Sequence, residues 1–132
     1  MSGFIDQPAA GIAILLWAAD PQAPHRLATP FFHAAAAAAM DLPVEIYFTA
    51  RSVQLLVPGV AASLRASATN DKTILDAMQE AVAHGALLLA CTDALQANGI
   101  DPQHQIAECS GRGGAVQFMA RAGDLRWRTL VY

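Results

Sequence analysis

Short apolar runs of strand length limit the folds open to this chain. Residues 11–17 and 86–90 are continuous apolar runs, which are typical of strands buried on both faces of a sheet, and residues 44–49 form a further segment of strand type. Residues 26–40 contain six consecutive alanines and therefore have high helix propensity. A strand, a long helix and a second strand in this order favour a parallel sheet.

The rest of the chain continues this alternation. Asp71 or Thr73 as the cap and Gly85 as the stop bound a helical stripe of apolar residues. The further predicted segments are a short helix at 50–56, a flexible loop at 63–71, helices at 73–84, 92–97 and 113–122, and strands at 105–108 and 125–131. The pattern predicts an α/β fold: a single-domain three-layer α/β/α sandwich over residues 1–132, with a mostly parallel five-stranded sheet.

Charge and cysteine usage exclude several classes of function. The net charge is −3, and no cluster of Lys and Arg resembles a nucleic-acid footprint, so we expect no nucleic-acid partner. The two cysteines form no Cys-x-x-Cys motif and no Cys/His cluster, which argues against a disulfide scaffold and a zinc site. We therefore expect no metal and no cofactor.

The N-terminus and the overall hydropathy bear on location and assembly. Residues 1–7 carry no positively charged leader, and the longest apolar runs are far shorter than the roughly 20 residues of a membrane span. These features predict a cytoplasmic protein without membrane contact. Hydrophobic residues make up 55% of the chain and charged residues 14%, so we expect an oligomer. The apolar residues that one small domain is expected to leave partly unburied include Phe31, Phe32, Leu55, Leu56 and Val57.

One edge of the predicted sheet gathers the candidate site residues. Right-handed crossovers place the carboxyl ends of parallel strands on one edge, where ligands bind in open α/β sheets. The predicted strand ends at this edge lie near Trp17, Thr49, Cys91 and Cys109. Thr92 follows Cys91 as the expected N-cap of a short helix, whose dipole and free N–H groups stabilise a Cys91 thiolate. Cys91 is therefore the candidate reactive residue.

Each candidate also has a structural interpretation. Cys91 is otherwise a small buried hydrophobe, since free cysteine is among the most buried residue types. Cys109 is either a second thiol that forms a disulfide with Cys91 or a structural cysteine. His25, in the loop after the first strand, either stabilises a thiolate or is a solvent-exposed loop residue. Trp17 either lines the sheet edge or belongs to the core.

Three segments carry a family resemblance. Residues 43–53 (PVEIYFTARSV) follow the alanine-rich helix and end a strand in a Phe-Thr loop. Residues 90–100 (ACTDALQANGI) place a cysteine before a short helix and a Gly-Ile pair, and residues 113–118 (GGAVQF) begin the last helix with two glycines. In this order and spacing, over about residues 12–131, the segments resemble the DsrE/DsrF/DsrH-like family of sulfur-relay proteins.

The resemblance implies a five-stranded α/β sandwich, assembly into a homotrimer or a hexamer, and a cysteine that carries sulfane sulfur as a persulfide. Cys91 matches the position of this carrier cysteine, and Thr92 stands where some members have a second cysteine. The implied partners are sulfur carriers of the TusA type or other sulfurtransferases. The resulting hypothesis is a cytoplasmic sulfur carrier or sulfurtransferase subunit that accepts sulfur on Cys91 and passes it to a partner thiol. The alternative is a non-catalytic oligomeric module that binds a small ligand or supports assembly.

Overall fold

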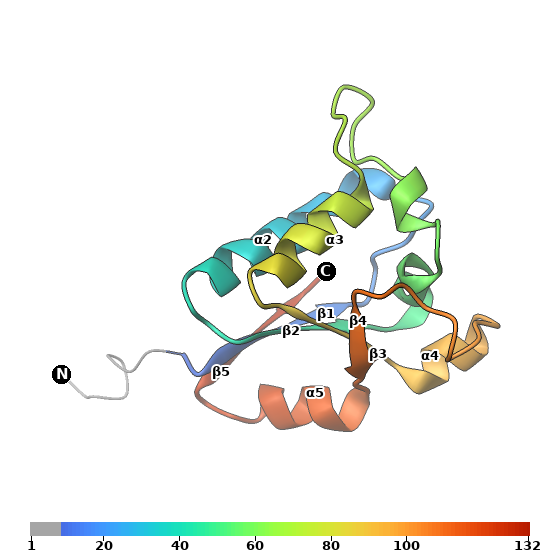
Figure 1. Ribbon diagram of the computed structural model, residues 1–132. Helices are drawn as coiled ribbons and strands as arrows, with labels where there is room; N and C mark the ends of the chain where they lie inside the picture. The colour runs from blue at the N-terminus through green and yellow to red at the C-terminus, as the bar shows by residue number, and fades with distance from the viewer. Residues whose placement is uncertain (1–8) are drawn as a thin grey trace.

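A computed structural model describes residues 9–132 and has three layers, with helices on both faces of a sheet (Figure 1). Helices α2 (Ala28–Ala39) and α3 (Ile74–Ala83) cover one face, and α5 (Ala115–Ala122) lies on the other. All strand pairs are parallel, in the order β4-β3-β2-β1-β5. The strands are β1 (Gly11–Leu16), β2 (Val44–Phe48), β3 (Leu87–Ala90), β4 (Cys109–Arg112) and β5 (Trp127–Val131). The predicted fold class is confirmed.

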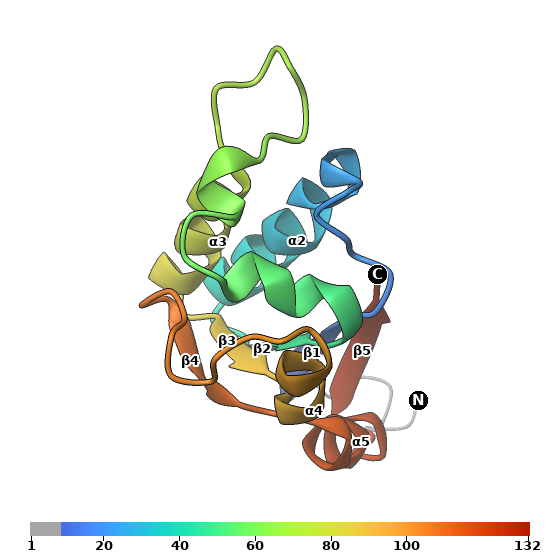
Figure 2. The same cartoon turned by 90° about the vertical axis from the view of Figure 1, so that its right-hand side faces the viewer.

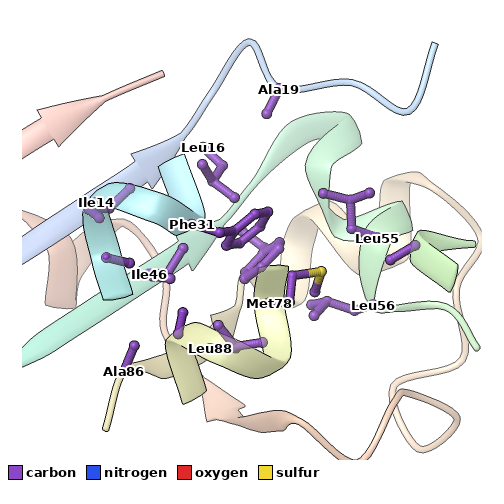
Figure 3. Close-up of a cluster of buried hydrophobic side chains, with 14 of the residues drawn as sticks. Ile14, Leu16, Ala19, Phe31, Ile46, Leu55, Leu56, Met78, Ala86 and Leu88 are labelled. Carbon is purple, nitrogen blue, oxygen red and sulfur yellow. The ribbon is translucent and has the colours of Figure 1, made fainter. Parts of the chain in front are cut away.

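The hydrophobic core lies between the sheet and the helices α2 and α3 (Figure 3). Alternate strand residues such as Ile14, Ile46 and Leu88 point into it and are fully buried. Small side chains along α2 let this helix lie close to the sheet, and Phe31 stacks on Phe48 with ring centroids 6.1 Å apart. The core therefore forms on the face where the alanine-rich helix packs.

The expectation of incomplete burial is wrong for Phe31, Leu55 and Leu56, which are fully buried. Leu55 and Leu56 end the 3₁₀ helix η2 (Ala50–Leu56), which brings both side chains into the hydrophobic core. Phe32, on the outer side of α2, is 43% exposed.

Short elements follow β2 and β3 at the carboxyl edge of the sheet, which faces the viewer in Figure 2. They are η2, which follows β2, and α4 (Thr92–Ala97), which follows β3. Asn98, at the end of α4, joins the two: its Nδ2 donates to the carbonyl of Ala50 (3.1 Å), and its Oδ1 accepts from Gln54 Nε2 (3.1 Å). The segments after β2 and β3 are thus held side by side.

The fourth strand differs from its prediction. Residues 105–108 form no strand; β4 begins at Cys109, whose pairing partner is Leu88. Gly111 then pairs with Leu89, so Ser110 is an extra residue in a bulge. The physical reason is that β4 gains its strand form from pairing with β3, because its own sequence, CSGR, has little apolar character.

Two further expectations concern membrane-spanning helices and the N-terminal residues. In residues 9–132 no helix has the length and hydropathy that crossing a bilayer requires. Residues 1–7, on which the expected absence of a leader depends, lie outside the described residues.

Candidate functional site

The register of four adjacent strands brings one residue from each to the same edge. Leu16 of β1 pairs with Phe48 of β2, Phe48 pairs with Ala90 of β3, and Ala90 pairs with Arg112 of β4. The next residues along these strands all line one pocket of about 330 Å³. They are Trp17, Thr49, Cys91 and Gly113.

The other walls of the pocket come from the same face of the sheet and from α5. Leu15 precedes Trp17 by two residues and Tyr47 precedes Thr49 by two, so the alternation of side chains along a strand puts all four on the α5 face. The first two turns of α5 close the opposite side. Their contribution consists of Gly114, Ala115, Phe118 and Met119. The pocket is therefore apolar except at the end near Thr49 and Cys91.

Backbone hydrogen bonds on both sides fix the position of Cys91. Its N–H donates to the carbonyl of Phe48 (3.0 Å), and its carbonyl accepts from the N–H of Leu95 (3.0 Å). Cys91 itself is the N-cap residue of α4, a position predicted for Thr92, and its side chain makes no capping hydrogen bond. The half-buried thiol is thus free to face the pocket.

The start of α5 lies directly beside the strand end that carries Cys91. The N–H of Gly113 donates to the carbonyl of Ala90 (3.1 Å). A side chain at Gly113 would begin 2.9 Å from the Tyr47 ring and 3.0 Å from Leu89, so this close approach requires glycine. Gly114, the N-cap residue, has no side chain to cap the first turn. The free N–H groups of that turn add partial positive charge at the pocket.

A polar network anchors α5 to the sheet behind the pocket. Arg121 donates from Nε and Nη2 to the two oxygens of the buried Glu45 carboxylate (2.9 Å each), and Tyr47 donates its hydroxyl proton to Oε1 of Glu45 (2.6 Å). The Arg121 guanidinium also lies 4.2 Å from the ring centroid of Trp127. Phe118 meets the Tyr47 ring edge to face, at 5.4 Å between centroids. Tyr47 therefore links the network to the pocket wall.

The network also sets the protonation of its members. Burial alone would raise the pKa of Glu45, but hydrogen bonds from Arg121 and Tyr47 outweigh it and lower this pKa below its ordinary value. Burial and the neighbouring carboxylate raise the pKa of Tyr47 to about 12. At neutral pH Glu45 is a carboxylate and Tyr47 a neutral phenol.

The structure brings together three of the predicted site residues. Trp17, Thr49 and Cys91 line the pocket, and Trp17 is 64% exposed, so it does not belong to the core. Thr92 follows Cys91 on the exposed side of α4 and does not line the pocket. His25 is exposed in the 3₁₀ helix η1 (Pro24–Arg26) and is also outside the lining.

The predicted placement of Cys109 at a strand end is wrong. Cys109 begins β4 and pairs with Leu88, which precedes Cys91 by three residues. Its Sγ faces the carbonyls of Leu88 (3.8 Å) and Gly111 (3.6 Å) and does not line the pocket. The residue that β4 contributes to the site is Gly113, because the strand lies four residues later than predicted.

Tyr47, Gly113 and the residues of α5 were not predicted from the sequence as site residues. Two signals were present: Tyr47 stands two residues before Thr49, and two glycines precede an apolar helix. No signal links Glu45 to Arg121, which are 76 residues apart. Within the described part of the chain, His, Cys, Asp and Glu side chains form no group of three that would hold a metal ion.

Comparisons with known proteins agree with this fold. The ychN protein from E. coli shares the fold with a TM-score of 0.71 at 14% identity, over 92% of this chain and 98% of that chain. MTH1491, a protein of unknown function from Methanobacterium thermoautotrophicum, aligns with a TM-score of 0.61 at 16% identity, over 92% and 97% of the two chains. No curated protein matches the chain in sequence. The sequence profile of the DsrE/DsrF-like family matches residues 13–124, and the chain therefore belongs to the DsrE/DsrF-like family.

Proposed function

We propose that the protein is a sulfur carrier that accepts sulfane sulfur on Cys91 and passes it to a partner thiol. The observation that carries the proposal is the position of Cys91: a thiol without a capping role, at the carboxyl edge of a parallel sheet, in the wall of a pocket beside the start of α5. Membership of the DsrE/DsrF-like family supports it.

The chemistry is thiol exchange in two balanced steps. The Cys91 thiolate attacks the outer sulfur of a donor persulfide R–S–SH; a bond forms between Sγ and that sulfur, the donor S–S bond breaks, and R–S⁻ leaves. An acceptor thiolate then attacks the same outer sulfur, takes it as a persulfide and releases the Cys91 thiolate. No oxidant or reductant is consumed, and no general base is needed once the thiolate is present.

The surroundings of Cys91 suit an anionic sulfur. The N-terminal turn of α5 points partial positive charge at this end of the pocket, and the Thr49 hydroxyl offers a hydrogen-bond donor within the same lining. The persulfide adds one sulfur atom to the side chain, and the pocket has room for it.

The partner in this proposal is a sulfur carrier of the TusA type or another sulfurtransferase, and the protein acts as a homotrimer or a hexamer. Large apolar side chains near the pocket support association: Trp17 is 64%, Val116 87% and Met119 62% exposed. Light scattering at micromolar concentration is expected to give a mass well above the 13.9 kDa of one chain. A monomer would contradict the oligomer.

Intact-mass spectrometry after incubation with excess inorganic polysulfide tests the carrier role. The protein is expected to gain steps of about 32 Da, the mass of one sulfur atom, and Cys91→Ser to lose them. Cys109→Ser is the matched control, because Cys109 lies outside the pocket, and it is expected to load normally. Equal loading of Cys91→Ser would overturn the proposal. A protein that loads no sulfur but binds a small apolar ligand would be the non-catalytic module instead.

A further inference from the structure

The apolar lining of the pocket beside Cys91 selects among sulfur donors. We propose that its substrate carries the sulfur on an uncharged apolar group of about the size of one aromatic ring, as in a small aryl or alkyl persulfide. This inference rests on the proposed function of Cys91 and adds the substrate class.

The size of the pocket supports a small organic group. Its volume is about 330 Å³, whereas an apolar cavity of roughly 150 Å³ holds benzene. Leu15, Phe118 and Met119 give it apolar walls, and Trp17 stands at its exposed side. One aromatic ring and a short stem therefore fit between the sheet and α5.

The charges around the pocket disfavour anionic carriers. Its ten lining residues, all within residues 9–132, include no Lys, Arg or His. Arg121, on the same helix as Phe118, is committed to the Glu45 carboxylate through two hydrogen bonds and to the Trp127 ring. A carboxylate of glutathione persulfide, or the dianion of thiosulfate, would lose water here without gaining a cation.

The one end that suits negative charge is the end where the sulfur must lie. Cys91 and Gly113 are adjacent there, joined through the hydrogen bond from Gly113 N–H to the Ala90 carbonyl, and the first turn of α5 begins at the same point. The substrate thus binds with its sulfur at Cys91 and its apolar group toward Phe118 and Met119. The transfer step is R–S–SH plus Cys91–S⁻ giving Cys91–S–SH plus R–S⁻, with R apolar.

Rates of sulfur loading on the full chain test the substrate class. Benzyl persulfide, glutathione persulfide and thiosulfate are offered at equal concentration, and the gain of about 32 Da is followed with time. We expect benzyl persulfide to load Cys91 at least tenfold faster than either anionic donor, after correction for their rates with a free thiol. Equal or faster loading by an anionic donor would overturn the inference and leave the carrier role standing.

A pair of lysine variants on α5 tests the charge argument. Met119 lines the pocket, whereas Ala120 lies on the same helix, is exposed and does not line it. Met119→Lys is expected to raise the rate with glutathione persulfide several-fold and to lower the rate with benzyl persulfide. Ala120→Lys, which adds the same charge outside the pocket, is expected to leave both rates within twofold. Equal effects of the two variants would mean that general charge, not the pocket, decides.

A readout that needs no sulfur transfer separates the two proposals. Benzyl alcohol is expected to protect Cys91 from iodoacetamide, and iodoacetate, the anionic reagent, to react at least fivefold more slowly relative to a free thiol. If no donor loads Cys91 but this protection is seen, the carrier role fails and the apolar pocket stands. Absence of protection together with equal rates for the two reagents would overturn the pocket preference.

Discussion

The two faces of the sheet are built differently. The face under α2 and α3 joins a core of 24 buried residues, whereas the α5 face has a cluster of three: Ala13, Tyr47 and Leu89. Helix α5 buries none of its residues completely and is attached through the Glu45–Arg121 pair. The first face supplies most of the apolar burial that stabilises the fold. The second leaves space between helix and sheet, and the pocket with Cys91 lies in that space.

The difference between the two faces predicts its largest effect on stability for two phenylalanines that lie on opposite faces of the sheet. Phe31→Ala removes a fully buried ring and is expected to cost about 3–5 kcal/mol of the free energy of unfolding. Phe118→Ala removes a partly buried ring and should cost about 1–2 kcal/mol of the free energy of unfolding. The cost is smaller because a partly buried ring contributes less stability than a fully buried one. Denaturant unfolding measures both.

The same two variants separate stability from reactivity. Phe118→Ala is expected to change the iodoacetamide rate of Cys91 several-fold, and Phe31→Ala, under conditions where it is folded, to leave this rate near that of the parent chain. Equal losses of stability with equal changes of rate would remove the distinction between the faces.

Removal of the guanidinium tests how α5 is held. Arg121→Ala leaves the Glu45 carboxylate, whose side chain is 9% exposed, with Tyr47 as its remaining partner. Breaking a fully buried pair costs about 3–5 kcal/mol. Because the Arg121 side chain is 34% exposed, we expect about 2 kcal/mol by thermal unfolding. Arg126→Ala, at an exposed position, is the control and should lie within about 0.5 kcal/mol of the parent.

Alanine substitutions of the two glycines before α5 form a matched pair, and we expect them to have a smaller effect on stability. Gly113→Ala places a Cβ 2.9 Å from the Tyr47 ring and is expected to cost about 1–2 kcal/mol, because the helix start must move away from the sheet. Gly114→Ala meets no atom within 4 Å and should cost less than about 1 kcal/mol. Chemical denaturation of both decides whether close approach is the constraint; equal costs would contradict it.

The smallest expected effect is a dependence on pH. The pKa of Glu45 is lowered in the folded state from its ordinary 4.5, so folding favours the carboxylate. Its contribution is present above about pH 4.5 and is lost as pH falls through the lowered pKa. The parent chain should therefore lose more stability than Glu45→Gln between pH 6 and pH 3, measured by calorimetry. The same loss in both would assign the acid sensitivity to other carboxylates.

Sequence reasoning succeeded where local pattern decides the structure. The apolar runs that became β1 and β3 and the alanines of α2 were recognisable because burial and helix propensity are local properties. Parallel strand order then brought Trp17, Thr49 and Cys91 together correctly.

It failed where distant pairing decides. The segment Cys109–Arg112 becomes a strand because β3 lies beside it. Since this strand lies later in the chain than predicted, Gly113 occupies the place in the site that was predicted for Cys109. The Glu45–Arg121 pair has no local signature, since it joins β2 to a helix 76 residues later. Arg121 thus holds the pocket wall, although no local pattern distinguishes it from the other arginines of the chain.

The two tryptophans of the chain make its intrinsic fluorescence sensitive to one face of the sheet only. Trp17 stands at the mouth of the pocket, and Trp127 lies between Gly11 and the Arg121 guanidinium, so both are on the α5 face. Intrinsic fluorescence consequently reports the site face and is nearly blind to repacking beneath α2 and α3. In a Trp17→Phe variant the emission would come from Trp127 alone and would follow the docking of α5.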